Sequence, residues 1–215
     1  MLSKLYGHFL SKHGAWFWKH RHWWDRKWPQ GYTSKESLEH PHRQLILNAL
    51  EPYAPFFHVL ELGCGGGANL YLISENKLIS DKYYTFGSAL GIDISREVIY
   101  QAEDTYINRF MDFCVQDIRL CEWRFPKNDA LVTDAMLIYL MPEEMGRVVE
   151  AIKECVLKVA VFCEWHSDEG PFVYDGHWVH NFKELFSGCE LRKLTWQDWQ
   201  DDGWSTYGHI ITWIR

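Results

Sequence analysis

The 215-residue chain lacks several features that would place it outside the soluble globular proteins. It has no run of about 18 apolar residues, the length that a membrane-crossing helix requires. Its first residues lack the continuous apolar stretch and the small-residue cleavage site of a signal peptide. No internal repeat, low-complexity tract or linker is present. These absences predict a cytoplasmic, single-domain protein with no membrane span.

Cysteine is present, but the six cysteines include no C-x-x-C pair. Closely spaced cysteines are typical of zinc sites and redox motifs. Cys114, Cys155 and Cys163 fall in or beside apolar strand patterns, so we expect buried thiols in a reducing compartment. Neither a disulfide framework nor a zinc site is expected.

Charge is unevenly distributed along a chain whose formal net charge is −7. Residues 1–35 hold seven Lys and Arg against one Asp, a charge of +6, so the remaining residues carry −13. The same segment is rich in aromatic side chains, and its apolar residues recur at helical spacing. We therefore divide the chain into a basic, aromatic helical arm or lid (1–35) and a main domain (36–215). Three aromatic residues of the arm are predicted to contact substrate: Trp16, Trp28 and Tyr32.

A glycine-rich turn lies between an apolar run and a helical pattern, in the segment Val59 to Leu70. It reads E-x-G-x-G-x-G, with Glu61 followed by Gly63, Gly65 and Gly67. Glycine is needed where the backbone takes φ > 0 or comes within contact distance of a ligand. The N-terminus of the following helix offers free N–H groups. The pattern therefore indicates a strand, a ligand-binding turn and a helix.

Acidic residues follow the next two strand patterns. Asp93 ends the apolar segment 89–93, and Asp117 follows the segment 110–116. In nucleotide-binding α/β folds, an acid at the end of the second strand accepts hydrogen bonds from ribose hydroxyls. A nicotinamide dinucleotide site stays open as an alternative, because the last position of its glycine fingerprint tolerates the alanine found at Ala68.

Glu61, the three glycines, Asp93 and Asp117 together resemble the class I S-adenosylmethionine-dependent methyltransferases. The resemblance implies a three-layer α/β/α sandwich of the Rossmann-like methyltransferase fold, with a helical N-terminal lid. Its seven-stranded sheet is mostly parallel with an antiparallel last strand. The resemblance also implies the cofactor S-adenosyl-L-methionine and the product S-adenosyl-L-homocysteine. The implied cofactor contacts are Glu61, Gly63, Cys64, Gly65, Gly67, Asp93, Ile94, Asp117 and Ile118.

Apolar periodicity predicts the remaining elements. Helices are expected over 42–50, 67–77, 95–106 and 142–154, and further strands over 128–134, 156–162, 191–196 and 209–214. A loop over 174–182 is expected to lead into a helix that ends near residue 186. The segment 197–208 is expected to be a loop.

Methyl transfer from a sulfonium requires alignment and exclusion of water more than it requires a base. Where a base is needed, His166 is the first candidate catalytic residue, because it follows the fifth strand and histidine suits proton removal at neutral pH. Asp134, at the end of the fourth strand, is the second. The predicted substrate contacts of the main domain are Tyr139, Trp165 and His177.

Two further histidine pairs allow more than one interpretation. His40 and His42 flank Pro41, and they indicate either a turn with a capping histidine or a contact to cofactor or substrate. His177 and His180 are three residues apart, a spacing that a metal site can use but that is not specific for one. We therefore predict no bound metal.

These patterns predict S-adenosylmethionine-dependent methyl transfer, by in-line displacement, to an O or N nucleophile of a small or medium organic acceptor. The acidic body argues against broad phosphate contact, so nucleic acid is an allowed but disfavoured partner. One alternative is an RNA or protein methyltransferase that uses the basic arm. Others are a non-catalytic cofactor-binding partner subunit and an S-adenosylmethionine-cleaving enzyme. The sequence leaves the acceptor atom and the oligomeric state open.

Overall fold

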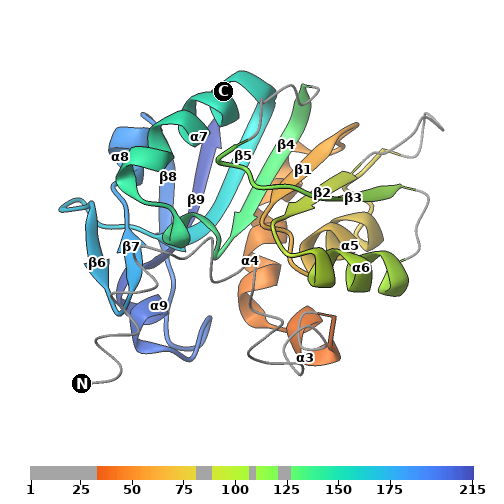
Figure 1. Ribbon diagram of the computed structural model, residues 1–215, viewed down its shortest axis with the longest axis horizontal. Coiled ribbons are helices and arrows are strands. Elements are labelled where there is room, and N and C mark those ends of the chain that lie inside the picture. The colour runs from red at the N-terminus through yellow and green to blue at the C-terminus, as the bar shows by residue number, and fades with distance from the viewer. Residues whose placement is uncertain (1–32, 81–88, 107–109, 121–126) are drawn as a thin grey trace.

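The structure is a computed structural model that describes residues 33–80, 89–106, 110–120 and 127–215 (Figure 1). The basic arm lies almost wholly outside these ranges. The predicted substrate contacts Trp16, Trp28 and Tyr32 therefore lie outside the described residues. The main domain carries the whole of the fold that follows.

Seven strands form one sheet in the order β3-β2-β1-β4-β5-β9-β8. The strands β1 to β5 pair in parallel, and β9 runs antiparallel to both β5 and β8, which confirms the predicted sheet. The bounds are β1 (Val59–Leu62), β2 (Ala89–Asp93), β3 (Met111–Val115), β4 (Asn128–Asp134), β5 (Val156–Trp165), β8 (Glu190–Lys193) and β9 (Gly208–Ile214).

Helices cover both faces of the sheet and bury two apolar cores (Figure 1). Alternate residues of a strand point to opposite faces, so Val59 joins the core under α4 and α5, whereas Leu60 joins the core under α7 and α8. The helical elements are α3 (Lys35–Leu38), α4 (Pro41–Leu50), η2 (Glu51–Tyr53), α5 (Ala68–Glu75), α6 (Arg96–Thr105), η3 (Leu137–Tyr139), α7 (Pro142–Cys155), α8 (Phe182–Leu185) and α9 (Asp202–Tyr207).

Local sequence signals explain where several helices begin. Proline is favoured at the first helical position, and both α4 and α7 begin with one. In α7 the carboxylate of Glu144 accepts a hydrogen bond from the backbone N–H of Met141 at 2.9 Å. In α3 the N-cap is Ser34, whose hydroxyl accepts from the N–H of Ser37 at 3.2 Å.

The largest departures from the predicted elements lie after β5. The predicted loop over 174–182 overlaps a hairpin of β6 (Phe172–Tyr174) and β7 (His177–Val179). Its turn residues Asp175 and Gly176 have φ of 41° and 82°. An Asp-Gly pair is a strong hairpin signal because both central residues of such turns need positive φ. The predicted loop over 197–208 likewise contains α9, whose N–H at Trp204 is capped by Asp201 at 3.0 Å.

Two further observations concern the cysteines and the membrane. Cys155 and Cys163 are buried as expected, but Cys114 is exposed because β3 is the edge strand of the sheet. Within the described ranges, no helix is both long and apolar enough to cross a membrane.

Candidate active site

A cavity of about 780 Å³ lies at the carboxyl ends of the parallel strands. Open α/β sheets bind their ligands at this edge, near the point where strand order reverses. The cavity runs from the β2 and β3 side, lined by Asp93 and Asp117, to the β5 and β9 side, lined by Trp165 and Trp204. We call these the β2–β3 end and the β5–β9 end.

The glycine turn forms the floor between β1 and α5. Gly63, Gly65 and Gly67 all have positive φ, at 70°, 52° and 81°. Gly63 and Gly65 line the cavity, and a Cβ at Gly63 would overlap the side chain of Met136. Gly67 does not line the cavity; it is the N-cap of α5, and a Cβ there would lie 2.7 Å from the Phe113 ring. Glycine is therefore required at Gly63 and Gly67 for packing as well as for backbone conformation.

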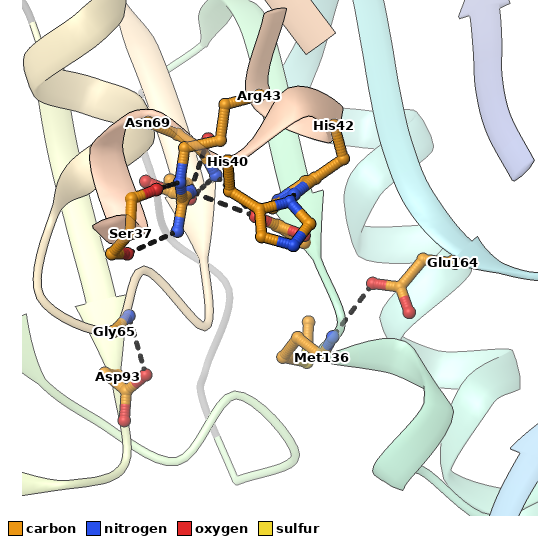
Figure 2. A network of polar contacts seen from close by, with 11 residues as sticks. Ser37, His40, His42, Arg43, Gly65, Asn69, Asp93, Met136 and Glu164 are labelled. Atoms are coloured by element: carbon orange, nitrogen blue, oxygen red, sulfur yellow. Dashed lines mark hydrogen bonds and ion pairs between the residues drawn. The ribbon is translucent and has the colours of Figure 1, made fainter. Parts of the chain in front are cut away.

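Asp93 connects the glycine turn to β2. Its carboxylate accepts a hydrogen bond from the backbone N–H of Gly65 at 3.0 Å (Figure 2) and another from the N–H of Ser95 at 2.8 Å. Burial raises the pKa of Asp93, and the backbone hydrogen bonds oppose that rise. Cys64 and Ile94 line the same part of the cavity.

The outer wall of the β2–β3 end comes from the loop after β3. Asp117 and Ile118 line the cavity, and so does Arg119, which the sequence analysis did not single out. The Arg119 guanidinium donates to Asp117 at 2.6 Å and to Glu144 of α7 at 2.8 Å. The hydrogen bond to Asp117 raises the pKa of Arg119 well above its usual range. The charge of this arginine is therefore already paired with two carboxylates.

Glu61 lies beneath the glycine turn with about 1% of its surface exposed. Its Oε1 accepts a hydrogen bond from Nδ2 of Asn69 in α5 at 2.8 Å, and Oε2 has no partner among the described residues. Burial raises the pKa of Glu61 to about 8. At neutral pH this side chain is therefore mainly protonated.

Asp134 is the centre of a polar network between the two ends, and Figure 2 labels its partners His42, Arg43 and Asn69. One oxygen, Oδ2, accepts from His42 Nε2 at 2.9 Å, from Arg43 at 3.1 Å and from Asn69 at 3.1 Å. Burial alone would raise the pKa of Asp134, but the positive charges and hydrogen bonds of its partners hold that pKa well below its usual range. Asp134 is therefore an ionised carboxylate at the floor of the cavity.

Arg43 of α4 fixes this network to the segment that precedes the fold's first strand. Its guanidinium also donates to the backbone oxygen of Ser37 at 2.6 Å, to the Ser37 hydroxyl at 3.1 Å and to Oδ1 of Asn69 at 2.7 Å. The sequence analysis missed Ser37, Arg43 and Asn69. Nothing in their local pattern signals a contact with a strand that begins 85 residues further along the chain than Arg43.

His40 and His42 both line the cavity. His40 is the N-cap of α4, but its side chain makes no capping hydrogen bond. His40 therefore takes the predicted N-cap position, but its ring does not cap the helix. Instead, Nδ1 of His40 faces Nδ1 of His42 at 2.5 Å.

Glu164 holds the loop after β4 in place. This fully buried carboxylate accepts a hydrogen bond from the backbone N–H of Met136 at 3.0 Å (Figure 2). It also accepts from the N–H groups of Leu137 at 3.0 Å and Ile138 at 3.2 Å. Burial raises the pKa of Glu164 to about 7. Glu164 thus acts on the cavity through the backbone that it positions.

The β5–β9 end is lined mainly by aromatic rings. Trp165 lies 5.1 Å from His177, 5.9 Å from Tyr174 and 5.8 Å from Trp204, measured between ring centroids. Tyr139 lies 5.1 Å from His177. The structure therefore brings the predicted substrate contacts Tyr139, Trp165 and His177 together in one wall.

Charge at the β5–β9 end is of one sign. Asp175, Asp201 and Asp202 line it, and no described Lys or Arg does. Burial lowers the pKa of His177, so this ring is neutral at neutral pH.

The structure does not bring His166 into the cavity lining. Its ring is about 5% exposed, with Nδ1 accepting from the N–H of Phe182 at 3.1 Å and Nε2 lying 3.2 Å from Asp168. Both ring nitrogens are therefore engaged on the far side of β5. The side chain of His166 points to the opposite face from that of Trp165, because successive residues of a strand alternate.

The chain matches no protein-family model and no curated protein. Among solved structures it is similar to magnesium protoporphyrin IX methyltransferase from Synechocystis PCC 6803 with bound SAM: TM-score 0.63, 12% identity, over 96% of this chain and 97% of that one. It is similar to the N-methyltransferase NodS from Bradyrhizobium japonicum WM9 in complex with S-adenosyl-L-homocysteine: TM-score 0.62, 13% identity, over 85% and 89%. It is also similar to human N-acetylserotonin methyltransferase in complex with SAM: TM-score 0.60, 16% identity, over 87% and 54%. The chain therefore has the class I S-adenosylmethionine-dependent methyltransferase fold.

Proposed function

We propose that this protein transfers a methyl group from S-adenosyl-L-methionine to an oxygen or nitrogen atom of a small or medium organic acceptor. One observation carries the proposal. A single cavity joins the glycine turn and Asp93 at one end to an aromatic wall at the other. Its volume of about 780 Å³ lies within the roughly 300–1,000 Å³ range of small-molecule sites.

The β2–β3 end has the groups that would hold the cofactor. The turn at Gly63 and Gly65 lets the backbone approach a ligand closely, and Asp93 is placed to accept hydrogen bonds from ribose hydroxyls. Ile94 and Ile118 supply apolar surface for the adenine, beside Asp117. The remaining proposed contacts of the cofactor are Glu61 and Cys64, with Gly67 supporting the turn.

When bound, S-adenosyl-L-methionine supplies an electrophilic methyl group on a cationic sulfonium. The ionised carboxylate of Asp134 at the cavity floor is paired with Arg43 at 3.1 Å, so the pair adds little net charge beside this cation. The cavity wall aligns the acceptor and excludes water, which are the main requirements of such a displacement.

The β5–β9 end favours a neutral or cationic acceptor over an anionic one. Its charged side chains are all aspartates, and its rings suit cation–π or stacking contacts. The two arginines that line the cavity, Arg43 and Arg119, are already paired with carboxylates. A phosphate or carboxylate on the acceptor would therefore meet like charge and no free cation among the described lining residues.

Cofactor binding is tested by calorimetry with S-adenosyl-L-methionine, S-adenosyl-L-homocysteine and NAD. We expect micromolar binding of the first two and none of NAD. Asp93→Ala should weaken binding roughly 10- to 150-fold, since hydrogen bonds to a charged group contribute about 1.5–3 kcal/mol. Asp104→Ala, on the exposed face of α6, is the matched control. Circular dichroism checks that both variants are folded.

Binding of NAD without S-adenosyl-L-methionine would overturn the proposal. Product analysis then separates the alternatives. S-adenosyl-L-homocysteine with a methylated small molecule indicates transfer, and methylthioadenosine indicates cleavage. Methyl label in RNA or protein would instead support a macromolecular acceptor, and binding without any product would indicate a non-catalytic subunit.

A further inference from the structure

A chain of three side chains crosses the cavity floor and ends at a ring nitrogen with no described partner. His42 Nε2 lies 2.9 Å from Asp134 Oδ2, and His42 Nδ1 lies 2.5 Å from His40 Nδ1. On the basis of the proposed function, we propose that His40 accepts the proton that the methyl acceptor loses. His42 and Asp134 position His40 and take up the charge.

The hydrogen-bond partners assign the ring protons. Asp134 is ionised and can only accept, so His42 must carry a proton on Nε2. The two facing Nδ1 atoms share a single proton between them. In the neutral pair that proton belongs to His40, which leaves the lone pair of His40 on Nε2.

His40 is kept in the neutral form that a base requires. Burial, then the charge of His42 whenever that ring is protonated, and then the positive charge of Arg43 lower its pKa to about 4, and Asp134 opposes that shift. A proton captured at Nε2 is therefore unfavourable on His40 itself. It becomes favourable when the Nδ1 proton moves across to His42, because the resulting cation lies 2.9 Å from the Asp134 carboxylate. The base strength belongs to the pair rather than to either ring.

Packing holds the two rings in this arrangement. Trp199 stacks on His42 with ring centroids 4.2 Å apart and an interplanar angle of 29°, and it contacts His40 at 5.0 Å. Trp204 in turn stacks on Trp199, with ring centroids 3.8 Å apart and an interplanar angle of 4°. The loop after β8 thereby sets the orientation of histidines that belong to α4 and to its N-cap.

The proposed step conserves atoms and charge. The acceptor atom forms a bond to the methyl carbon, and the carbon–sulfur bond breaks with its electron pair left on sulfur. The acceptor's proton goes to Nε2 of His40, and the Nδ1 proton of His40 goes to His42. The positive charge lost at sulfur thus reappears on His42, beside Asp134. This chemistry selects an acceptor atom that carries both a proton and a lone pair, such as the oxygen of a hydroxyl or the nitrogen of an uncharged amine.

The first arm of the test needs no acceptor. Calorimetry with S-adenosyl-L-homocysteine decides cofactor binding and so tests the proposed function. Nitrogen-15 NMR of the histidine rings, in the S-adenosyl-L-homocysteine-saturated protein, then follows the tautomers against pH. We expect His40 to be protonated on Nδ1 and bare on Nε2 at neutral pH. On acidification both rings should change together as the pair takes up one proton. A protonated Nε2 on His40, or independent titration of the two rings, would overturn the relay even if the cofactor binds.

The second arm measures turnover with methyl-labelled S-adenosyl-L-methionine and a panel of phenols and primary amines. His40→Gln should lower kcat on a methylated panel member by about 10²–10⁴-fold, the usual contribution of a general base. The same variant should lose the fall in kcat at low pH. Its affinity for S-adenosyl-L-homocysteine should stay within about threefold of the wild type, since binding does not use the base. His58→Gln, an exposed histidine outside the cavity lining, is the matched control.

An unchanged rate and an unchanged fall in kcat at low pH in His40→Gln would refute the assignment. Asp134→Asn adds a check on the positioning role, because it should lower the pH at which the histidine pair takes up its proton. If Asp134→Asn does not fold, His40→Gln still decides the question, since His40 is only half-buried and makes no capping bond. If no panel member is methylated, the NMR result decides.

Discussion

The two ends of the cavity are built in different ways. At the β2–β3 end the contacts join elements that follow one another in the chain. Glu61 bonds Asn69 eight residues away, and Gly65 bonds Asp93 across 28 residues. Towards the β5–β9 end they are remote: His42 bonds Asp134 across 92 residues. Strand, turn and acid recur in a fixed order at the first end, whereas the second is assembled from α4, the loop after β4, the hairpin β6–β7 and α9.

The difference shows which part of such a site is general and which is individual. The β2–β3 end makes backbone turns and a ribose-type acid site, which suit one cofactor. The β5–β9 end gathers aromatic rings and aspartates that suit one class of acceptor. The buried carboxylates Glu61, beneath the glycine turn, and Asp134, between the two ends, both accept from Asn69 but are in opposite protonation states.

The largest expected effect tests those protonation states. The pKa of Glu61 is raised from 4.5 to about 8 in the folded chain, so the folded state holds a proton that the unfolded chain releases. Stability is therefore fully present below about pH 4.5 and falls as pH rises to about 8, by up to about 5 kcal/mol. Glu61→Gln should remove this dependence, as measured by urea unfolding without cofactor at about pH 5 and about pH 9. Glu75→Gln, which changes an exposed glutamate at the end of α5, is the control. An equal change in the free energy of unfolding between the two pH values, in the wild type and in Glu61→Gln, would show that Glu61 is ionised in the folded chain.

The next effect compares the two arginines of the cavity. Arg43 is about 12% exposed and neutralises a buried carboxylate, so Arg43→Ala should lower the free energy of unfolding by about 3–5 kcal/mol. Arg119 is about 29% exposed and pairs with carboxylates that retain contact with water. Arg119→Ala should cost only about 1 kcal/mol. Denaturant titrations at one pH measure both, and equal losses would remove the distinction between the two ends.

A smaller effect tests the charge of the acceptor. In the presence of S-adenosyl-L-homocysteine, tryptamine should bind at least about tenfold more tightly than indole-3-acetate, because three aspartates at the β5–β9 end attract the ammonium and repel the carboxylate. The preference should shrink with added salt. Calorimetry measures both ligands, and a preference for the carboxylate would reverse the assignment of charge at this end.

The smallest effect isolates one of those aspartates. Asp202→Asn should weaken tryptamine binding about two- to threefold and leave S-adenosyl-L-homocysteine binding unchanged, because Asp202 lines only the β5–β9 end. Asp104→Asn, exposed on α6, should change neither affinity. An equal loss of cofactor affinity in Asp202→Asn would mean that the two ends are not separate.

Much of the fold was predictable because its signals are periodic and local. The bounds of β2 match the predicted strand 89–93, α7 begins at residue 142 as predicted, and α4 begins at Pro41, one residue before the predicted start. The hairpin β6–β7 was missed although Asp175 and Gly176 carry its turn signal, because its strands are only three residues long. The helix α9 was missed for a similar reason, since six residues give too little periodicity.

The candidate site divides in the same way. Asp93, Asp117 and the cavity-lining glycines lie where the pattern placed them, whereas His166 lies on the other side of β5 from the cavity. The sequence analysis identified the strand that carries the β5–β9 end but selected the wrong neighbour, since adjacent strand residues face opposite sides. Trp165 faces the cavity, and His166 faces Phe182.

The sequence by itself determined the seven strands of the main sheet in chain order, the glycine turn and the acids that follow β2 and β3. These are short-range features, in which backbone conformation and strand ends dictate residue type. Only the tertiary structure decided that His40, His42 and Asp134 form one chain, and that Trp199 and Trp204 hold it. The reason is physical: these contacts join segments far apart along the chain, and no local periodicity records which buried polar groups will meet.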